Sequence, residues 1–281
     1  KYINRLIFDE ILSTFIINCN IRRNFKKKLK TPKKINFSLT NYVEKNIGFN
    51  LTKDQIDAIN QINLDIKSKE RMFRLLQGDV GSGKTIVSLI AARNTILNEY
   101  QVAYMAPTEI LAKQHHKLFS KVFENSINSE ILTGKTEAKK RKSIIFNLSK
   151  KKIDIIFGTH ALFQKKIKFK KLGLIIIDEQ HKFGVNQRKK LSDKGGPNCD
   201  VLVMSATPIP RTMMMTLFGD MDITLIKSKP NNRKEINTYT KDVNKIDEII
   251  KFIKKEIYNK NQIFWVCPLI QLSKKIDHQS S

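Results

Sequence analysis

One glycine-rich stretch limits the possible folds of this chain more than any other feature of its sequence: Gly78-Asp79-Val80-Gly81-Ser82-Gly83-Lys84-Thr85. It matches the pattern G-x-x-x-x-G-K-[ST], with an apolar run at 73–76 before it and a helix predicted over 85–92 after it. Glycines allow successive backbone N–H groups to turn inward around phosphate oxygens, and the helix adds the positive end of its dipole. The stretch therefore predicts a nucleoside triphosphate site. Lys84 would reach the β- and γ-phosphates, and the Thr85 hydroxyl would bind Mg²⁺.

The chain is strongly basic, with 52 Lys and Arg against 26 Asp and Glu in 281 residues and a formal net charge of +26. Such an excess is typical of proteins that bind nucleic acids. Only ten of the 52 basic residues are arginine, however, and asparagine and isoleucine are abundant, which an AT-rich coding sequence would also produce. The charge favours a nucleic-acid partner, but on its own it leaves the compositional explanation open.

The cysteines predict a reducing compartment, because Cys19, Cys199 and Cys267 are widely separated and form no disulfide or metal pattern. No apolar run approaches the roughly 18 residues that a membrane-spanning helix needs. We therefore expect a cytoplasmic protein without a membrane partner. The chain does not start with Met, and we expect that it begins inside a longer protein.

Two helices are predicted before the phosphate loop. Residues 1–30 have apolar positions at helical spacing and end in a basic tract at 22–28, which could contact phosphates or be a solvated helix end. The second helix begins near residue 51, where Thr52 and Gln55 form a capping box. Gln55 could instead recognise adenine, because its side-chain amide can donate one hydrogen bond to the base and accept another from it. Phe49 would then be a stacking partner for the base. The residues alone leave both interpretations of Gln55 open.

From residue 72 to 226, short apolar runs alternate with helical stretches, which predicts a doubly wound α/β fold with a buried parallel sheet. Each predicted strand ends in a polar motif, and the carboxyl ends of such strands share one edge of the sheet, where ligands bind. We therefore expect five motifs to converge on one cleft. After the phosphate loop they are Pro107-Thr108-Glu109 behind the strand 102–105, Gly158-Thr159-His160 behind 153–157, Asp178-Glu179-Gln180-His181 behind 174–177, and Ser205-Ala206-Thr207 behind 201–204.

The carboxylates at 178 and 179 are the candidate catalytic pair. Asp178, at the end of a buried strand and facing the phosphate loop, is placed to hold Mg²⁺. Glu179 can orient and deprotonate a water for attack on the γ-phosphate. Next to them, Gln180 and His181 are candidates for coupling the nucleotide to the hydroxyl groups of the loop 205–207.

Taken in this order, the motifs resemble the first motor domain of a superfamily 2 helicase. The longer matches resemble the RecG family of bacterial ATP-dependent DNA helicases, which remodel stalled forks and branched recombination intermediates. The resemblance runs from about residue 1 to 270 and is carried by the stretches 75–85, 105–112, 132–135, 158–164, 177–185 and 204–212.

The resemblance implies three parts. Residues 1–45 would be a helical connector that follows an oligonucleotide-binding wedge domain, and 46–230 a RecA-like ATP-binding domain of the P-loop NTPase class. Residues 231–281 would open a second RecA-like domain, with a strand at 236–239, a helix at 243–258 and a strand at 263–267. The family is far longer than 281 residues, so we expect this chain to be a fragment.

The resemblance also implies ligands and residue roles. ATP and Mg²⁺ are the expected cofactors, DNA the expected partner, and a monomer the expected state. Gln55 would be the adenine-reading glutamine. A DNA strand would run along Pro107, Thr108, Glu109, Gly134, Lys135, Gly158, Thr159 and His160, and a plain turn at the end of a strand is the less favoured alternative for 158–160. No role is assigned to Arg211.

One motif of the family is missing from this sequence: nowhere does it contain the Q-x-x-G-R-x-G-R pattern that supplies arginine fingers. This keeps open a nucleotide- and DNA-binding module without turnover. A related family of translocases, which couples transcription to repair, is a further alternative. It usually has Glu at the place of Gln180 and Phe at the place of Ser82, so both residues argue against it.

Overall fold

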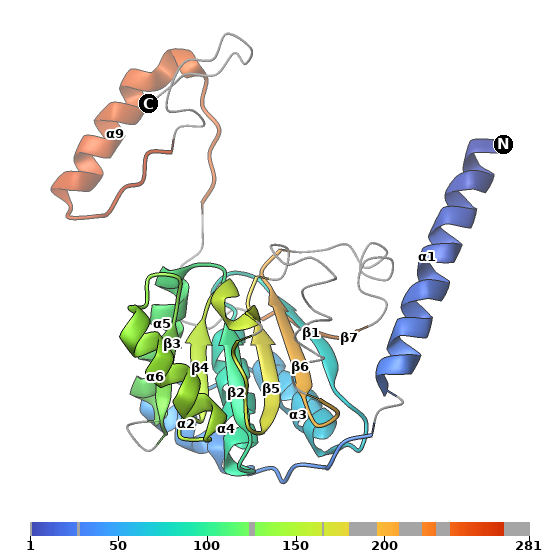
Figure 1. Ribbon diagram of the computed structural model, residues 1–281. Coiled ribbons are helices and arrows are strands. Elements are labelled where there is room, and N and C mark those ends of the chain that lie inside the picture. Colours follow the sequence, from blue (N-terminus) through green and yellow to red (C-terminus); the bar gives the residue numbers. More distant parts are fainter. Residues whose placement is uncertain are drawn as a thin grey trace. The chain divides into compact units, whose positions relative to one another are not determined.

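The structure is a computed structural model that describes residues 2–26, 29–123, 127–164, 166–179, 196–207, 221–228 and 237–266 (Figure 1). The chain divides into two compact units, residues 1–232 and 233–281. The predictions for Gln180, His181 and Arg211 lie outside the described residues. Among the described residues, no helix has both the length and the apolar character that crossing a membrane requires.

A seven-stranded sheet forms the centre of the first unit, with the strand order β3-β4-β2-β5-β6-β1-β7 and parallel pairing throughout. The predicted doubly wound α/β fold is confirmed. The strands are β1 (Phe73–Gly78), β2 (Gln101–Met105), β3 (Ser129–Leu132), β4 (Ile155–Gly158), β5 (Leu172–Ile177), β6 (Asp200–Ser205) and β7 (Asp222–Ile226). The helices are α1 (Tyr2–Lys26), α2 (Leu39–Ile47), α3 (Lys53–Lys67), α4 (Lys84–Leu97), α5 (Glu109–Phe123), α6 (Ala138–Ser149) and the short η2 (His160–Phe163).

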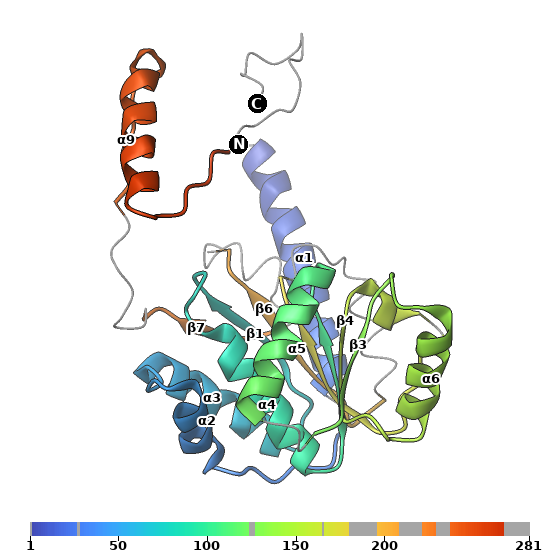
Figure 2. The same cartoon turned by 90° about the vertical axis from the view of Figure 1, so that its left-hand side faces the viewer.

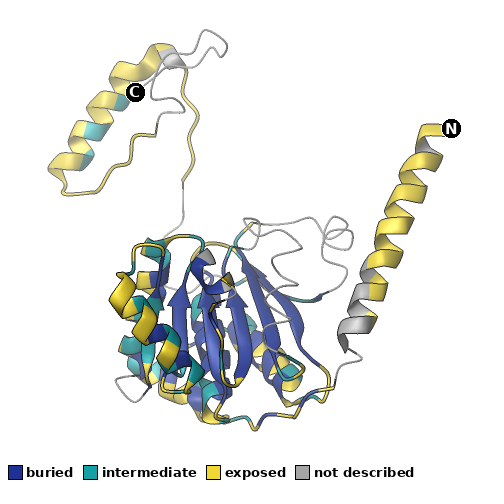
Figure 3. Ribbon diagram, in the orientation of Figure 1, coloured by how far each residue is buried: buried dark blue, intermediate teal, exposed yellow. Residues whose placement is uncertain are grey.

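Both faces of the sheet are buried, which explains the nearly continuous apolar strands (Figure 3). Along β2, Val102 and Tyr104 belong to the core beneath α2, α3, α4 and α5, whereas Ala103 and Met105 belong to the core beneath α6 and η2. The side-chain alternation of a strand thus supplies two separate cores. Figure 2 shows α2 and α3 on one side of the sheet and α6 on the other.

The edge strands β3 and β7 were not predicted. Only some of their residues are buried, among them Leu132 and Ile226, whereas Leu225 of β7 is 43% exposed. An edge strand has fewer neighbours to cover it, so its sequence lacks the unbroken apolar run that identifies the inner strands.

The second unit confirms the predicted helix, but neither of its two predicted strands is present in the described residues. Its predicted helix is present as η4 (Val243–Lys245) followed by α9 (Ile246–Tyr258). Residues 263–266, predicted as a strand with residue 267, have no regular structure, and Phe264 and Val266 are each 87% exposed. A strand needs a neighbouring strand to receive its backbone hydrogen bonds, and the described residues of this unit contain none. Likewise, residues 237–239 are irregular where a strand was predicted.

The first helix ends at Lys26, and residues 29–36 form an extended strap against the amino-terminal edge of the sheet. Within the strap, Lys30 and Lys33 place their Nζ atoms 2.5 and 2.6 Å from the two carboxylate oxygens of Asp200, at the start of β6. All three side chains are at most 1% exposed. The Asp200 carboxylate also accepts the backbone N–H of Met72 at 2.8 Å. Two cations and one carboxylate are therefore buried together beneath the strap.

Candidate active site

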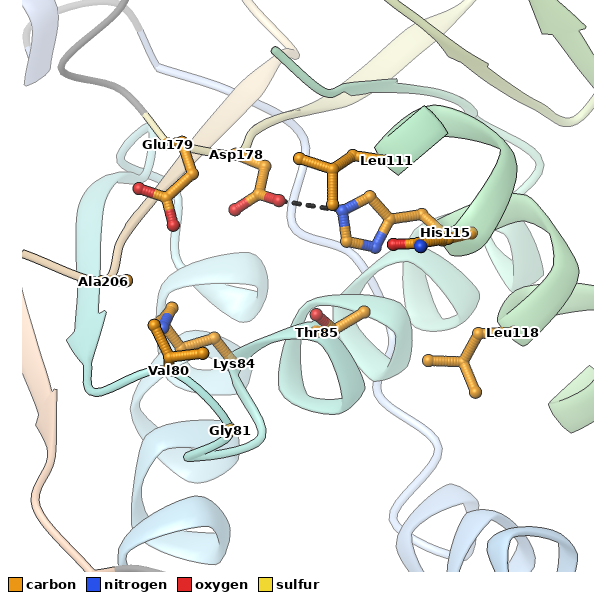
Figure 4. Close-up of a pocket in the computed structure, with 11 residues that line it drawn as sticks. Val80, Gly81, Lys84, Thr85, Leu111, His115, Leu118, Asp178, Glu179 and Ala206 are labelled. Atoms are coloured by element: carbon orange, nitrogen blue, oxygen red, sulfur yellow. Dashed lines mark hydrogen bonds and ion pairs between the residues drawn. The ribbon is translucent and has the colours of Figure 1, made fainter. Parts of the chain in front are cut away.

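A pocket of about 310 Å³ lies at the carboxyl edge of the sheet (Figure 4). Three of the five predicted motifs line it: the phosphate loop after β1, the carboxylates after β5 and the loop after β6. The expectation that all five motifs share one cleft stays a prediction, because 107–109 and 158–160 do not line this pocket. The strand order is the reason, since β2 and β4 continue the sheet beyond β5 on the side away from β1. The lining residues are Val80, Gly81, Lys84, Thr85, Leu111, Gln114, His115, Leu118, Asp178, Glu179 and Ala206.

The phosphate loop places an ammonium group beside carboxylates. Lys84 begins α4, and its Nζ donates to the backbone carbonyls of Gly78 at 2.6 Å and Asp79 at 3.0 Å. Because an ammonium has three N–H donors, one is left for a ligand. Burial lowers the pKa of Lys84, and the charges of Glu179, Asp178 and Asp79 oppose that shift.

Gln55 forms the predicted capping box and also supports the phosphate loop. Its Oε1 accepts the Thr52 N–H at 2.9 Å, and Thr52 Oγ1 accepts the Gln55 N–H at 3.3 Å. Its Nε2 donates to the Ser82 carbonyl at 2.7 Å, a contact that was not predicted. Gly83 has φ +89°, a left-handed conformation that favours glycine, and a Cβ there would displace the Gln55 amide. Gln55 is 2% exposed, whereas Phe49 is 46% exposed and outside the pocket lining, and adenine recognition by these two residues stays a prediction.

Asp178 is held from two sides. Its backbone N–H donates to Met105 O at 2.8 Å, and its Oδ2 lies 2.8 Å from Nε2 of His115 on α5. Glu179 follows with φ +51°, a left-handed conformation that costs a non-glycine residue on the order of 1–3 kcal/mol. Both carboxylates line the pocket. Since Gln180 and His181 lie outside the described residues, their coupling role stays a prediction.

His115 is the functional candidate that sequence reasoning missed. The signal was present: His115 stands three residues after Ala112 and four before Phe119, and both are buried, so a polar ring occupies the apolar face of a helix. What it contacts there depends on strand β5, 63 residues further along the chain. No pattern within the helix contains that information.

The loop after β6 is linked to the phosphate loop by Gln77, which was also missed. Ser205 Oγ and Thr207 Oγ1 lie 2.9 Å apart, and Ser205 Oγ also accepts the Thr207 N–H at 3.3 Å. Gln77, the residue before Gly78, donates from Nε2 to the Thr207 carbonyl at 2.8 Å. Ala206 lines the pocket. A polar residue in a buried strand directly before the phosphate loop was the available signal.

The predicted DNA-contacting residues lie together at the ends of β2, β3 and β4. Glu109 Oε1 accepts the backbone N–H of Lys135 at 3.3 Å, next to Gly134, and Thr108 Oγ1 accepts the Leu111 N–H at 3.3 Å. A Cβ at Gly158 would collide with the Leu132 carbonyl, so the ends of β4 and β3 approach closely there. Thr159 directly precedes η2, which begins at His160, and the side chain of His160 is not described. Pro107 lies between β2 and Thr108. Contact of these residues with DNA stays a prediction.

Parallel strands, a glycine-rich loop at a helix start and paired carboxylates across the pocket define a P-loop nucleotide-binding domain. The sequence model of the family "DEAD/DEAH box helicase" matches residues 52–216, and the chain belongs to that family. It is 47% identical over 238 residues to ATP-dependent DNA helicase RecG of Bacillus subtilis (strain 168), covering 84% of this chain and 35% of the relative. It is 41% identical over 278 residues to RecG of Thermotoga maritima, covering 99% and 36%.

A solved structure supports the same relationship. RecG bound to a three-way DNA junction matches with a TM-score of 0.80 and 37% identity, over 91% of this chain and 34% of that one. The predicted resemblance is therefore confirmed, and the RecA-like helicase fold with it. The chain spans about a third of the length of the curated relatives it matches.

Proposed function

We propose that this chain is the nucleotide-binding motor domain of an ATP-dependent DNA helicase that acts on branched DNA, as part of recombination and repair. The observation that carries the proposal is the pocket itself, in which Lys84 and Thr85 lie opposite Asp178 and Glu179. The likeness to RecG on a three-way junction supports branched DNA as the substrate. We also propose that the protein is cytoplasmic and that it acts as a monomer.

The lining residues fit a magnesium nucleotide. Thr85 and Asp178 offer one hydroxyl and one carboxylate, which suits Mg²⁺ because this ion usually takes only one or two protein oxygens and completes its shell with water and phosphate. The described residues contain no cluster of three or more His, Cys, Asp or Glu that could hold a metal alone. When bound, the ion neutralises charge on the phosphates. Lys84 would donate to the γ-phosphate, and Glu179 would orient the attacking water and accept its proton.

Nucleotide binding should depend on the Lys84 ammonium. Replacing it in Lys84→Ala removes a charged donor, and such a hydrogen bond contributes about 1.5–3 kcal/mol. Affinity for a fluorescent ATP analogue in the presence of Mg²⁺ should fall roughly 10-fold to 100-fold, measured by equilibrium titration. Lys67→Ala, which removes an exposed lysine in the last turn of α3, is the matched control and should bind like the wild type. Equal affinities for wild type and Lys84→Ala would contradict the proposed site.

DNA binding by this chain should weaken steeply with salt. Lysines crowd residues 135–171, and each phosphate they neutralise releases counterions, with a slope of about 0.9 per contact in a plot of log affinity against log salt. Lys135→Ala should reduce the slope by about one, measured by fluorescence anisotropy on a labelled duplex, whereas Lys67→Ala should leave it unchanged.

The same titration should show little preference for a fork over a linear duplex. The chain corresponds to 34% of the RecG chain seen on a three-way junction, and the resemblance assigns fork recognition to a wedge domain outside these 281 residues. Several-fold tighter binding to a fork at matched salt would show that this domain recognises branches by itself.

A further inference from the structure

We propose that His115 is a positioning residue for the predicted metal ligand Asp178, and that a buried network of His115, Tyr104 and Ser88 links Asp178 to the other predicted ligand, Thr85. This inference rests on the proposed function, because it assigns a role toward a magnesium nucleotide. It adds residues from α5, β2 and α4 that belong to none of the predicted motifs for nucleotide chemistry.

The first link is the contact between the imidazole and the carboxylate. His115 Nε2 lies 2.8 Å from Asp178 Oδ2, with both residues buried. An ionised carboxylate only accepts hydrogen bonds, so Nε2 carries the proton and donates it. Figure 4 shows the second carboxylate oxygen directed into the pocket and away from His115. The imidazole thus fixes the rotation of the carboxylate and leaves one oxygen to face the ligand.

The second link runs from the imidazole ring to α4. The Tyr104 ring packs against the His115 ring with centroids 4.8 Å apart, and Tyr104 is fully buried. The Tyr104 hydroxyl lies 3.2 Å from Ser88 Oγ, and Ser88 Oγ donates to the Thr85 carbonyl at 2.8 Å. A serine hydroxyl has a single hydrogen, so Tyr104 is the donor to Ser88. The backbone of Thr85 is therefore connected through three side chains to the carboxylate of Asp178.

The two predicted ligands are thereby held at a fixed separation before any ion enters. Asp178 and Thr85 lie on different elements, 93 positions apart in the sequence, and one hydroxyl and one carboxylate bind an ion well only at the right spacing. Partners that orient a ligand typically contribute a factor of 10–100 in metal affinity. The network should therefore affect the Mg²⁺-dependent part of nucleotide binding and leave the Mg²⁺-independent part unchanged.

The test measures nucleotide affinity at a series of Mg²⁺ concentrations and in EDTA, using a fluorescent ATP analogue and the whole 281-residue chain. In His115→Leu, the Mg²⁺ concentration for half-maximal binding should rise about 10-fold, while the affinity in EDTA should stay within about twofold of wild type. His115→Gln, whose amide can donate from about the position of Nε2, should restore most of the Mg²⁺ dependence. Tyr104→Phe, which keeps the ring and removes the link to Ser88, should fall between wild type and His115→Leu.

His116→Gln is the matched control, because His116 is the next residue of the same helix but its Nε2 lies 3.0 Å from Ser129 Oγ on β3. It should show the Mg²⁺ dependence of the wild type. If His115→Leu does not fold, His115→Asn takes its place, since the shorter amide keeps the polarity but cannot reach the carboxylate.

The outcomes separate this inference from the proposed function. A wild-type chain that binds no nucleotide under any condition would overturn both. A second outcome is that the wild-type chain binds the magnesium nucleotide and His115→Leu or His115→Asn has the same Mg²⁺ dependence. This result would leave the proposed function intact and overturn the role of His115. A loss that His115→Gln fails to restore would also overturn it, because the donated hydrogen bond is the proposed cause.

Discussion

The 281-residue chain should hydrolyse ATP at a rate near background, even with DNA bound. In the proposed site, Lys84, Asp178 and Glu179 would bind the nucleotide and orient water. The transition state of phosphoryl transfer also spreads negative charge over the equatorial oxygens and needs a further cation. An arginine finger that supplies this charge contributes about 10³–10⁵ in rate, or about 4–7 kcal/mol of barrier.

No arginine of the described residues lines the pocket. Arg74 is bonded elsewhere, to Asp65 at 2.6 Å and to Thr224 at 2.8 Å. The sequence contains no Q-x-x-G-R-x-G-R motif. The described residues that line the pocket therefore include no arginine that could supply this cation.

A phosphate-release assay with and without branched DNA measures this expectation. Glu179→Gln should change the slow rate little, because orientation of water is not what limits a reaction that lacks the stabilising cation. A DNA-stimulated rate of many turnovers per second, abolished in Glu179→Gln, would show that the chain assembles its own catalytic cation.

Replacing the buried carboxylate of Asp200 should destabilise the domain by about 3–5 kcal/mol, the usual loss when one partner of a buried ion pair is removed. In Asp200→Asn, the ammonium groups of Lys30 and Lys33 stay buried without a counter-charge. Urea unfolding followed by circular dichroism measures the loss. Glu130→Gln is the control: its contact with Lys140 is 3.8 Å long and exposed, so the stability should change by less than about 1 kcal/mol.

The deficit of Asp200→Asn should shrink as the pH rises toward 10.5. Burial lowers the pKa of Lys30, and the Asp200 charge opposes this shift in the wild type. Without the Asp200 charge, the pKa of Lys30 in folded Asp200→Asn is lowered further than in the wild type. As the pH rises toward 10.5, the unfolded variant still holds a proton on Lys30 that the folded variant has released, so its free energy of unfolding increases with pH. A loss in Asp200→Asn below about 1 kcal/mol, or a deficit that grows at alkaline pH, would contradict a buried ion pair beneath the strap.

The sequence by itself determined the phosphate loop, the inner strands and the place of Asp178 and Glu179 at the end of β5. Each of these rests on a short local pattern. Glycine spacing decides how the loop can turn, and an unbroken apolar run identifies a strand that is buried on both faces. The capping box of Gln55 is equally local, since its two partners are three residues apart.

Only the tertiary structure decided which residues meet across the chain. Three sets of contacts join residues that are 63 to 170 positions apart in the sequence. They are His115 with Asp178, Gln77 with Thr207, and the ion pairs of Lys30 and Lys33 with Asp200. The strand order also decided that the ends of β2 and β4 lie beyond the pocket lined by Lys84 and Asp178. Such contacts depend on which strands become neighbours and on which face of a helix packs against them. A local pattern fixes the shape of a segment, whereas its partners are fixed by the packing of the whole core.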